Sequence, residues 1–323
     1  MDPASDVRRI HEEAIVVDAH NDTIVAHMRL GLGLTFRTDK LQLDLPRMRE
    51  GGLDVAFFAI DVTRATKSHL TYALDALGFL EGELSSSENL IAPILRVRDL
   101  IEIPDQGRIG ALLAIENSDA LEGSLYVLRA LFKLGIRSIG LTHNPRSLAA
   151  DGVDEARTGG GLTNFGIRLV EEMNRLGILV DLAHVSERGF WEALDLSKKP
   201  VIVSHANCKA LCDHKRNLND EQIRGLADKG GVLGLSFVPS FIDPGSPSLQ
   251  RLLDHVDHVV KIAGIEFVGL GSDFDGGGTL LKDVTVLPEV TKGLFERGYT
   301  EEEVKKILGE NFIRVLSKVL PNP

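Results

Sequence analysis

Eight short apolar runs, spread over the whole chain of 323 residues, constrain the fold more than any other feature of the sequence. The runs are rich in β-branched and aliphatic residues and are followed by turn or polar residues, so each predicts a buried strand. Most of them are continuously apolar rather than alternating, which is typical of parallel strands covered on both faces. They comprise residues 15–19, 55–60, 111–115, 138–142, 179–183, 201–204, 232–237 and 267–271.

Helical patterns lie between these runs. In three segments the apolar residues recur at a spacing of three and four, as in an amphipathic helix. The segments are residues 72–83, 125–134 and 164–176. Gly135 and Gly177 follow the second and third segments and are expected to end those helices, and Thr163 or Asn164 begins the third.

Near the end of the chain, Thr300 followed by Glu303 is a capping box that predicts a helix to about residue 318. Eight strands that alternate with helices, without a linker between them, predict an α/β protein: a single (β/α)₈ TIM barrel spanning residues 1–323. Two stretches depart from a minimal barrel. Residues 29–48 predict an inserted loop, and residues 149–161, which end in three glycines, predict a mobile loop beside the barrel mouth.

The composition fits a large folded domain and excludes several classes of function. With 43% hydrophobic and 26% charged residues, the chain can bury a sizeable core. Its formal net charge of −11 and the lack of a Lys/Arg cluster argue against a nucleic-acid partner. Aromatic residues make up only 5% of the chain, which argues against a surface that stacks bases.

Features of export and membrane insertion are missing from the sequence. No segment has the pattern of a secretory signal, and no apolar stretch reaches the roughly 18–20 residues of a membrane span. We therefore expect a cytoplasmic protein with no membrane anchor.

The two cysteines, Cys208 and Cys212, cannot form a disulfide framework in a chain of this length. If their segment is helical, they share a face and could bind a metal. The simpler interpretation is that they are small, partly buried thiols.

The residues that end the apolar runs are unusually polar. In a TIM barrel the active site lies at the C-terminal ends of the strands, so these residues are candidates for function. Four of the ten histidines in the chain occupy such positions. The set is His20 and Asp22 after the first run, Glu116 after the third, His143 after the fourth, His184 after the fifth, His205 after the sixth, and Asp273 and Asp275 after the eighth.

Imidazoles and carboxylates that converge on one barrel mouth match the ligands of two divalent cations such as zinc. Glu116, in the middle of the set, is the natural bridge between them. Two ions about 3.5–4 Å apart would share a hydroxide, because they lower the pKa of bound water. A single histidine after an apolar run is more often a hydrogen-bonded structural residue, so the metal interpretation depends on the whole set. It predicts a hydrolase.

Six motifs resemble those of the membrane (renal-type) dipeptidase family, peptidase family M19, in the amidohydrolase superfamily. The resemblance covers residues 12–317, in order and without a missing element. Two positions depart from the family pattern: Asn117 stands where Gly is usual, and Ala206 where Ser is common. The motifs are residues 17–22 (VDAHND), 115–116 (IE), 141–144 (LTHN) with 150–152 (ADG), 181–184 (DLAH), 204–207 (SHAN) with 214–217 (HKRN), and 271–276 (GSDFDG).

The resemblance implies a role for each site residue. It implies that His20 and Asp22 bind one zinc ion, that His184 and His205 bind the other, and that Glu116 bridges the two. His143 resembles the histidine that polarises the scissile carbonyl and contacts substrate. Arg216 resembles the arginine that receives the C-terminal carboxylate of the substrate, although on its own it would be read as a surface arginine. Asp273 resembles the aspartate that transfers the proton and meets the free amine, and Asp275 is expected to support the ligands without binding metal.

The implied activity is hydrolysis of dipeptides by a hydroxide bridging two zinc ions. C-terminal D-residues, β-lactams and a homodimer are family possibilities. One alternative is another binuclear amidohydrolase, such as a lactonase or a cyclic-amide hydrolase, but many of those begin with His-x-His and use a carboxylated lysine. The other is a non-catalytic metal-binding barrel, which should have lost a ligand. None of the implied residues is missing.

Overall fold

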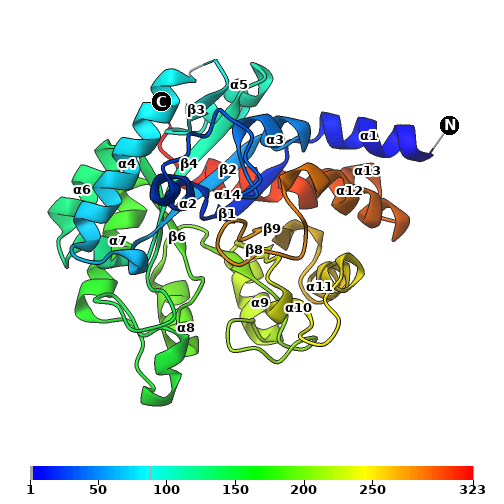
Figure 1. Cartoon of the computed structure of the whole chain (residues 1–323). Coiled ribbons are helices and arrows are strands. Elements are labelled where there is room, and N and C mark those ends of the chain that lie inside the picture. The colour runs from blue at the N-terminus through cyan, green and yellow to red at the C-terminus, as the bar shows by residue number, and fades with distance from the viewer. Residues whose placement is uncertain (1–2, 88, 323) are drawn as a thin grey trace.

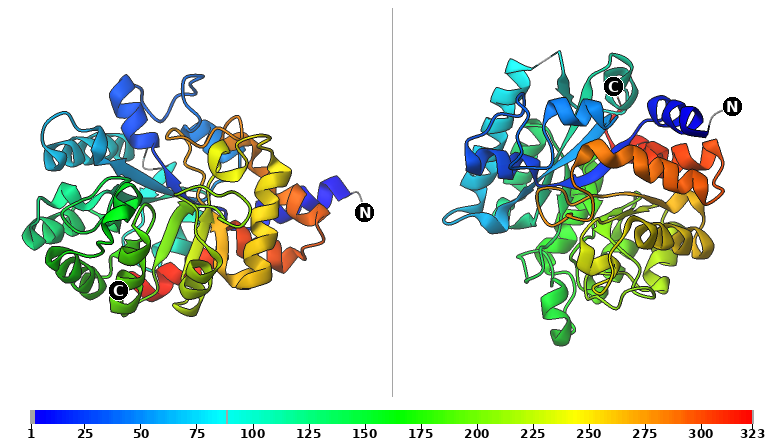
Figure 2. Two further views of the ribbon diagram at one scale, coloured as in Figure 1. Left: turned by 90° about the horizontal axis from the view of Figure 1, so that it is seen from below. Right: turned by 45° about the vertical axis from the view of Figure 1, so that its right-hand side comes forward.

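All eight predicted runs form strands, and together they close a parallel barrel. The computed structural model describes residues 3–87 and 89–322. Pairing between Asp18 and Leu270 joins the last strand to the first. Helices surround the strands on the outside (Figure 1, Figure 2). The strands, in their order around the barrel, are β1 (Val17–Asn21), β2 (Val55–Asp61), β4 (Ile109–Glu116), β5 (Ile136–Gly140), β6 (Leu179–Asp181), β7 (Ile202–Ala206), β8 (Val232–Leu235) and β9 (Val268–Leu270).

A ninth short strand, β3 (Ile91–Pro93), was not predicted. It pairs with the first half of β4, where Ile91 lies opposite Ile109, while β5 pairs with the second half of the same edge. Thus β3 extends the sheet without entering the barrel.

The predicted helices form close to their expected positions. Residues 72–83 lie in α4 and residues 164–176 are α7. Gly177 ends α7 in a left-handed conformation, and Thr163 caps its start by accepting a hydrogen bond from Gly166. Leu134, not Gly135, is the C-cap of α6, and Gly135 follows it at φ 107°. The helices along the barrel are α2 (Thr23–Leu30), α4 (His69–Ser86), α5 (Asp99–Asp105), α6 (Leu125–Lys133), α7 (Asn164–Leu176), α8 (Glu187–Leu196), α9 (Asp220–Asp228), α11 (Leu249–Ile262) and α12 (Leu287–Glu296).

The last helix is interrupted, although the sequence predicts one helix from Thr300. The Thr300–Glu303 capping box begins α13 (Glu301–Lys305), a π-helical turn (Lys306–Glu310) follows, and α14 (Asn311–Val319) completes the segment. Phe312 of α14 packs beneath the barrel with residues that begin several strands, among them Val55 and Val232. The C-terminal helix therefore closes the end of the barrel opposite the predicted site.

Three further helices of the described chain lie outside this ring. The first, α1 (Pro3–Glu13), packs beside α12, where His11 Nδ1 lies 2.7 Å from Thr291 Oγ1 (Figure 1). Residues 29–48 contain the predicted insertion, but its loop is limited to residues 31–44 between α2 and α3 (Leu45–Glu50). The third is α10 (Pro239–Ile242), which follows β8.

Residues 149–161 lie beside the barrel mouth, as predicted. They contain a 3-10 helix (Val153–Thr158), and the backbone N–H of Val153 donates to the carbonyl of His184. Mobility of this loop stays a prediction.

Both cysteines are free and buried, and their segment is a turn rather than a helix. The Sγ atoms of Cys208 and Cys212 lie near the carbonyl oxygens of His255 and Ser240. Among the described residues, neither cysteine belongs to a group that could hold a metal. The interpretation as buried thiols is therefore confirmed.

Asp54, just before β2, is expected to lower stability at neutral pH. Its Oδ2 accepts a hydrogen bond of 2.8 Å from the backbone N–H of Val16, and burial raises the pKa of its carboxyl group to about 6. Because the folded chain holds this proton more tightly than the unfolded chain, the free energy of unfolding falls as pH rises from about 4 to 6. We expect Asp54→Asn to raise that free energy by about 1–3 kcal/mol at pH 8, and by less toward pH 4.

Urea unfolding of wild type and Asp54→Asn at pH 5 and pH 8 measures this effect. Asn can still accept the hydrogen bond from Val16, so only the ionisable group changes. Asp213→Asn, at a carboxylate whose side chain is 86% exposed, is the matched control and should change little. An equal effect of Asp54→Asn at both pH values would contradict the prediction.

Candidate active site

The eight residues expected to bind metal or substrate or to act in catalysis converge at the C-terminal ends of the strands: His20, Asp22, Glu116, His143, His184, His205, Arg216 and Asp273. Seven of them line a cavity of about 300 Å³, and His20 lies beside it, 3.8 Å from Glu116. His20 and His205 lie within β1 and β7, Glu116 ends β4, and the others follow their strands by one to three residues or lie in the loop after β7. The strand ends therefore bring together residues that are up to 253 positions apart, from His20 to Asp273.

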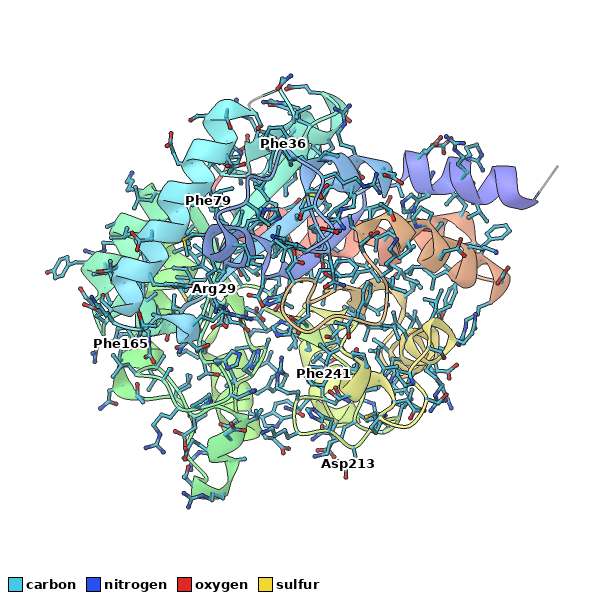
Figure 3. All side chains as sticks on the ribbon, viewed as in Figure 1. Arg29, Phe36, Phe79, Phe165, Asp213 and Phe241 are labelled. Atoms are coloured by element: carbon cyan, nitrogen blue, oxygen red, sulfur yellow. The ribbon has the colours of Figure 1, made fainter. Side chains whose placement is uncertain are left out.

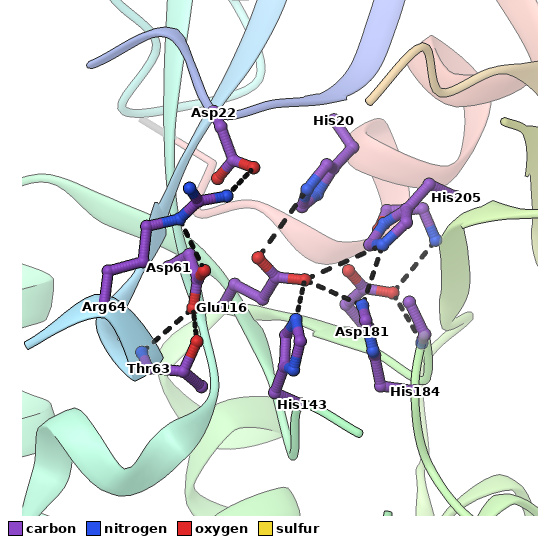
Figure 4. A network of polar contacts seen from close by, with 12 residues as sticks. His20, Asp22, Asp61, Thr63, Arg64, Glu116, His143, Asp181, His184 and His205 are labelled. Atoms are coloured by element: carbon purple, nitrogen blue, oxygen red, sulfur yellow. Dashed lines mark hydrogen bonds and ion pairs between the residues drawn. The ribbon is translucent and has the colours of Figure 1, made fainter. Parts of the chain in front are cut away.

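Glu116 lies at the centre of four imidazole rings (Figure 4). Its Oε1 is 2.8 Å from His184 Nε2, 3.7 Å from His205 Nε2 and 3.9 Å from His143 Nε2. Its other oxygen, Oε2, is 3.8 Å from His20 Nε2. The two oxygens of one carboxylate thus face different histidines, which is the arrangement that a bridging ligand requires.

Within residues 3–87 and 89–322, four overlapping groups of side chains could hold a metal ion, each with donor atoms within 4.8 Å of one another. His143 and Asp273, to which the resemblance assigns roles other than metal binding, also lie within these groups. The groups are His20, Glu116 and His205; Glu116, His143 and His184; His20, Asp22 and Asp273; and Asp22, Asp61 and Glu116.

Two of the imidazoles are oriented by hydrogen bonds on the side away from Glu116. His184 Nδ1 is 2.8 Å from Asn144 Oδ1, and His205 Nδ1 is 2.9 Å from Ser204 Oγ. The two Nε2 atoms then lie only 2.9 Å apart. Asn144 Oδ1 can only accept, so Nδ1 of His184 carries the proton and its Nε2 presents a lone pair. Partners of this kind fix the tautomer of metal-binding histidines.

Burial disfavours charge on the five residues that could bind metal according to the resemblance. It lowers the pKa of His20 to about 3 and holds the pKa values of His184 and His205 well below the usual range, so these imidazoles are neutral. Burial, followed by repulsion from neighbouring carboxylates, raises the pKa values of Asp22 and Glu116 well above their usual range. Neutral imidazoles beside clustered carboxylates are the donor set that dications stabilise.

A buried carboxylate oxygen supports the interpretation of this cluster as a metal site. Asp22 Oδ1 has no hydrogen-bond partner among the described residues. A buried carboxylate oxygen without a partner is costly unless a cation binds it. Asp275 differs, because its oxygens accept hydrogen bonds from Thr23 and Gln42, as expected of a supporting residue.

The backbone around the site is strained at residues other than glycine. His184 and Asp273 have φ angles of 69° and 60°, in the left-handed region that such residues rarely adopt. Asn117 follows Glu116 at φ 73°, which explains in physical terms why Gly is common there in the family. Gly276 is also required, because a Cβ atom there would lie 2.1 Å from Asp22 Oδ2 and 2.2 Å from Asp273 Oδ1.

Arg216 is buried, with only 3% of its surface exposed, contrary to the reading as a surface arginine. Its Nη2 donates to the carbonyl of His205 at 3.0 Å, and its guanidinium carbon lies 5.5 Å from the ring centre of Phe241. Phe241, which Figure 3 labels, lies in α10. Its Nε has no partner in the described part of the chain. Burial lowers the pKa of Arg216 to about 10, so the group stays charged at neutral pH.

Sequence reasoning missed two charged residues that line the cavity, Asp61 and Arg64. Asp61 is the last residue of β2, so the rule applied to the other strand ends would have found it. Arg64 follows three residues later, and nothing in its local sequence marks it.

Comparison with known proteins places this geometry in a family. The model of the membrane dipeptidase family, peptidase family M19, matches residues 4–321. The chain belongs to this family. An uncharacterised dipeptidase of Schizosaccharomyces pombe is 34% identical over 96% of this chain and 82% of its own length. The recognition made from the motifs is therefore confirmed, and the chain is a metal-dependent dipeptidase of the M19 family.

Two solved metallopeptidase structures resemble this enzyme closely. One is a metallopeptidase of Rhodobacter sphaeroides bound to a phosphinate mimic of the dipeptide L-Ala-D-Ala, with 29% identity, coverage of 95% and 100% of the two chains, and a TM-score of 0.87. The other is a family M19 dipeptidase with 30% identity, coverage of 95% and 98%, and a TM-score of 0.88. Both confirm the barrel.

Within residues 3–87 and 89–322, no helix of this M19 enzyme is both long and apolar enough to cross a membrane.

Proposed function

We propose that this M19 dipeptidase holds two zinc ions and cleaves the single peptide bond of dipeptides, including those with a C-terminal D-residue, by means of a hydroxide that bridges the ions. The observation that carries the proposal is Glu116, a buried carboxylate in a small cavity whose two oxygens face different histidines. The L-Ala-D-Ala mimic bound by the Rhodobacter sphaeroides enzyme supports the tolerance of a D-residue.

The proposed ligands are His20 and Asp22 for one ion and His184 and His205 for the other, with Glu116 between them. Neutral histidines and a carboxylate oxygen without a partner favour this assignment. When bound, the ions would supply the nucleophile by lowering the pKa of water and would polarise the scissile carbonyl.

Arg216 is proposed to bind the C-terminal carboxylate of the substrate. A buried guanidinium in the cavity wall can form two parallel hydrogen bonds to a carboxylate. This interaction becomes stronger when water is excluded. Because the cavity is about 300 Å³, it suits a molecule the size of a dipeptide more than an extended peptide.

Two further side chains are proposed to act on the peptide bond. His143 lines the cavity with its Nε2 3.9 Å from Glu116, where it can donate a hydrogen bond to the developing oxyanion. Asp273 lies across the cavity near His20 and Asp22, where it can bind the free amine, accept a proton and pass it to the leaving amine.

A dipeptide library with L,L and L,D members, assayed with zinc-loaded enzyme, tests the function. We expect turnover of free dipeptides and a decrease in kcat/KM of about a hundredfold or more for the same peptides with an amidated C-terminus, because a buried charge would lose its partner. Tripeptides of matched composition should be equally poor substrates. Good turnover of amidated dipeptides would refute the role of Arg216, and no turnover of any dipeptide would refute the function.

The cytoplasmic location and the homodimer stay predictions from the sequence and the family resemblance.

A further inference from the structure

Asp61 and Arg64 form a charged pair in the cavity wall that the roles above leave unexplained. Asp61 is fully engaged: its Oδ1 accepts hydrogen bonds from the backbone N–H and the hydroxyl of Thr63, at 2.9 and 2.5 Å, and its Oδ2 accepts from Arg64 Nε at 2.8 Å. A carboxylate with both oxygens occupied is poorly suited to bind a metal. Its position favours a different task, which is to orient Arg64.

Arg64 in turn contacts a proposed metal ligand. Its Nη2 donates to Asp22 Oδ2 at 3.0 Å, as Figure 4 shows, and the side chain of Asp22 is only 5% exposed against 31% for Arg64. The other oxygen of Asp22, Oδ1, is the buried atom without a partner. One oxygen is therefore held by Arg64 while the other remains free to bind a cation.

We infer that Arg64, aligned by Asp61, is a positioning residue for Asp22 that sets the affinity of one of the two metal sites. The inference rests on the proposed binuclear function. Holding Oδ2 restricts the rotation of the Asp22 carboxylate before an ion binds, and Asp22 lies with His20 and Asp273 in one group that could hold that ion. Such outer partners of metal ligands typically contribute about 10- to 100-fold in metal affinity.

The geometry requires arginine rather than lysine. Arg64 uses Nε for Asp61 and Nη2 for Asp22, so a single planar group joins two carboxylates. A lysine ammonium would supply the same charge but could not hold both acids in this fixed geometry. Arg64→Lys therefore separates the effect of charge from the effect of alignment.

Zinc titration of metal-stripped protein against a chromophoric chelator tests the inference without measuring activity. Wild type should bind two equivalents. In Arg64→Met one equivalent should weaken by about 10- to 100-fold while the other stays unchanged, and Arg64→Lys should recover part of the loss. Arg37→Met is the matched control, since Arg37 forms a 2.8 Å ion pair with Glu50 on the surface, and it should bind both equivalents as wild type does.

Asp61→Asn provides a second variant in case Arg64→Met folds poorly. It keeps Arg64 but removes the charge that aligns it, so the same equivalent should weaken to a smaller extent. Cobalt substitution gives a spectroscopic readout, because only the visible absorption of the affected site should change. Unchanged affinity of both equivalents in Arg64→Met, or equal weakening of both, would overturn the inference. Fewer than two equivalents in wild type would instead refute the binuclear function on which it rests.

Discussion

Glu116→Ala is expected to abolish tight binding of the metal pair and to lower kcat/KM for dipeptides by about a thousandfold or more, which corresponds to about 4 kcal/mol in the activation barrier. Glu116 is the one proposed ligand placed between both sets of histidines, with Oε1 toward His184 and Oε2 toward His20. Its loss removes a ligand from both ions at once. Metal analysis after gel filtration and steady-state kinetics measure the two effects.

Glu116→Gln separates charge from shape. The amide keeps the size of the side chain but not its negative charge, so we expect a smaller loss of metal than in Glu116→Ala. Glu171→Ala, at an exposed position of α7, is the control and should keep full metal content and activity. Two metals per chain retained in Glu116→Ala would contradict the bridging assignment, whatever the activity.

The barrel could be predicted because the strands carry their signal locally. Most runs are continuously apolar, and the structure buries them between the barrel interior and the surrounding helices, so their composition alone reveals them. The site could be predicted for a related reason. Parallel strands end at one rim, so residues distant in sequence, such as His20 and Asp273, need no pairwise signal to be placed together.

Other parts of the fold depend on contacts with distant segments, which the local sequence does not predict. The strand β3 is only three residues long and ends in Pro93, so its own sequence shows no strand pattern. Its pairing with β4 makes it a strand. The π-helical turn in the last helix has a similar origin. It contains Gly309, where a Cβ atom would lie 2.0 Å from the carbonyl oxygen of Ile15, so close packing on a distant segment shapes this part of the helix.

The same limit explains why Arg64 was missed. Its importance comes from two carboxylates, Asp61 at the end of β2 and Asp22 after β1, that meet only in the folded barrel. Arg216 shows the complementary case. On its own the residue suggested a surface arginine, and only the motif around it indicated a role, whereas the structure buries it in the wall of the cavity.

Arg216→Met is expected to lower kcat/KM about a thousandfold for a free dipeptide, which corresponds to about 4 kcal/mol in the activation barrier. For the same dipeptide with an amidated C-terminus, we expect kcat/KM to change little. The guanidinium is buried and charged, and a substrate carboxylate would be its partner. Removing either the guanidinium or the substrate carboxylate should therefore cause most of the decrease in kcat/KM. Removing both should lower kcat/KM only slightly further. Kinetics of the two enzymes on the two substrates form a complete double-mutant cycle.

The cycle also distinguishes binding from damage to the metal centre. Arg216 Nη2 donates to the carbonyl of His205, so loss of the side chain could disturb that proposed ligand. Such damage would lower turnover of free and amidated dipeptides by the same factor and would reduce metal content. Arg216→Lys keeps the charge without the two-pronged geometry, and we expect it to recover only part of the activity on free dipeptides. Equal losses on both substrates, with metal content unchanged, would contradict the role of Arg216 in binding the carboxylate.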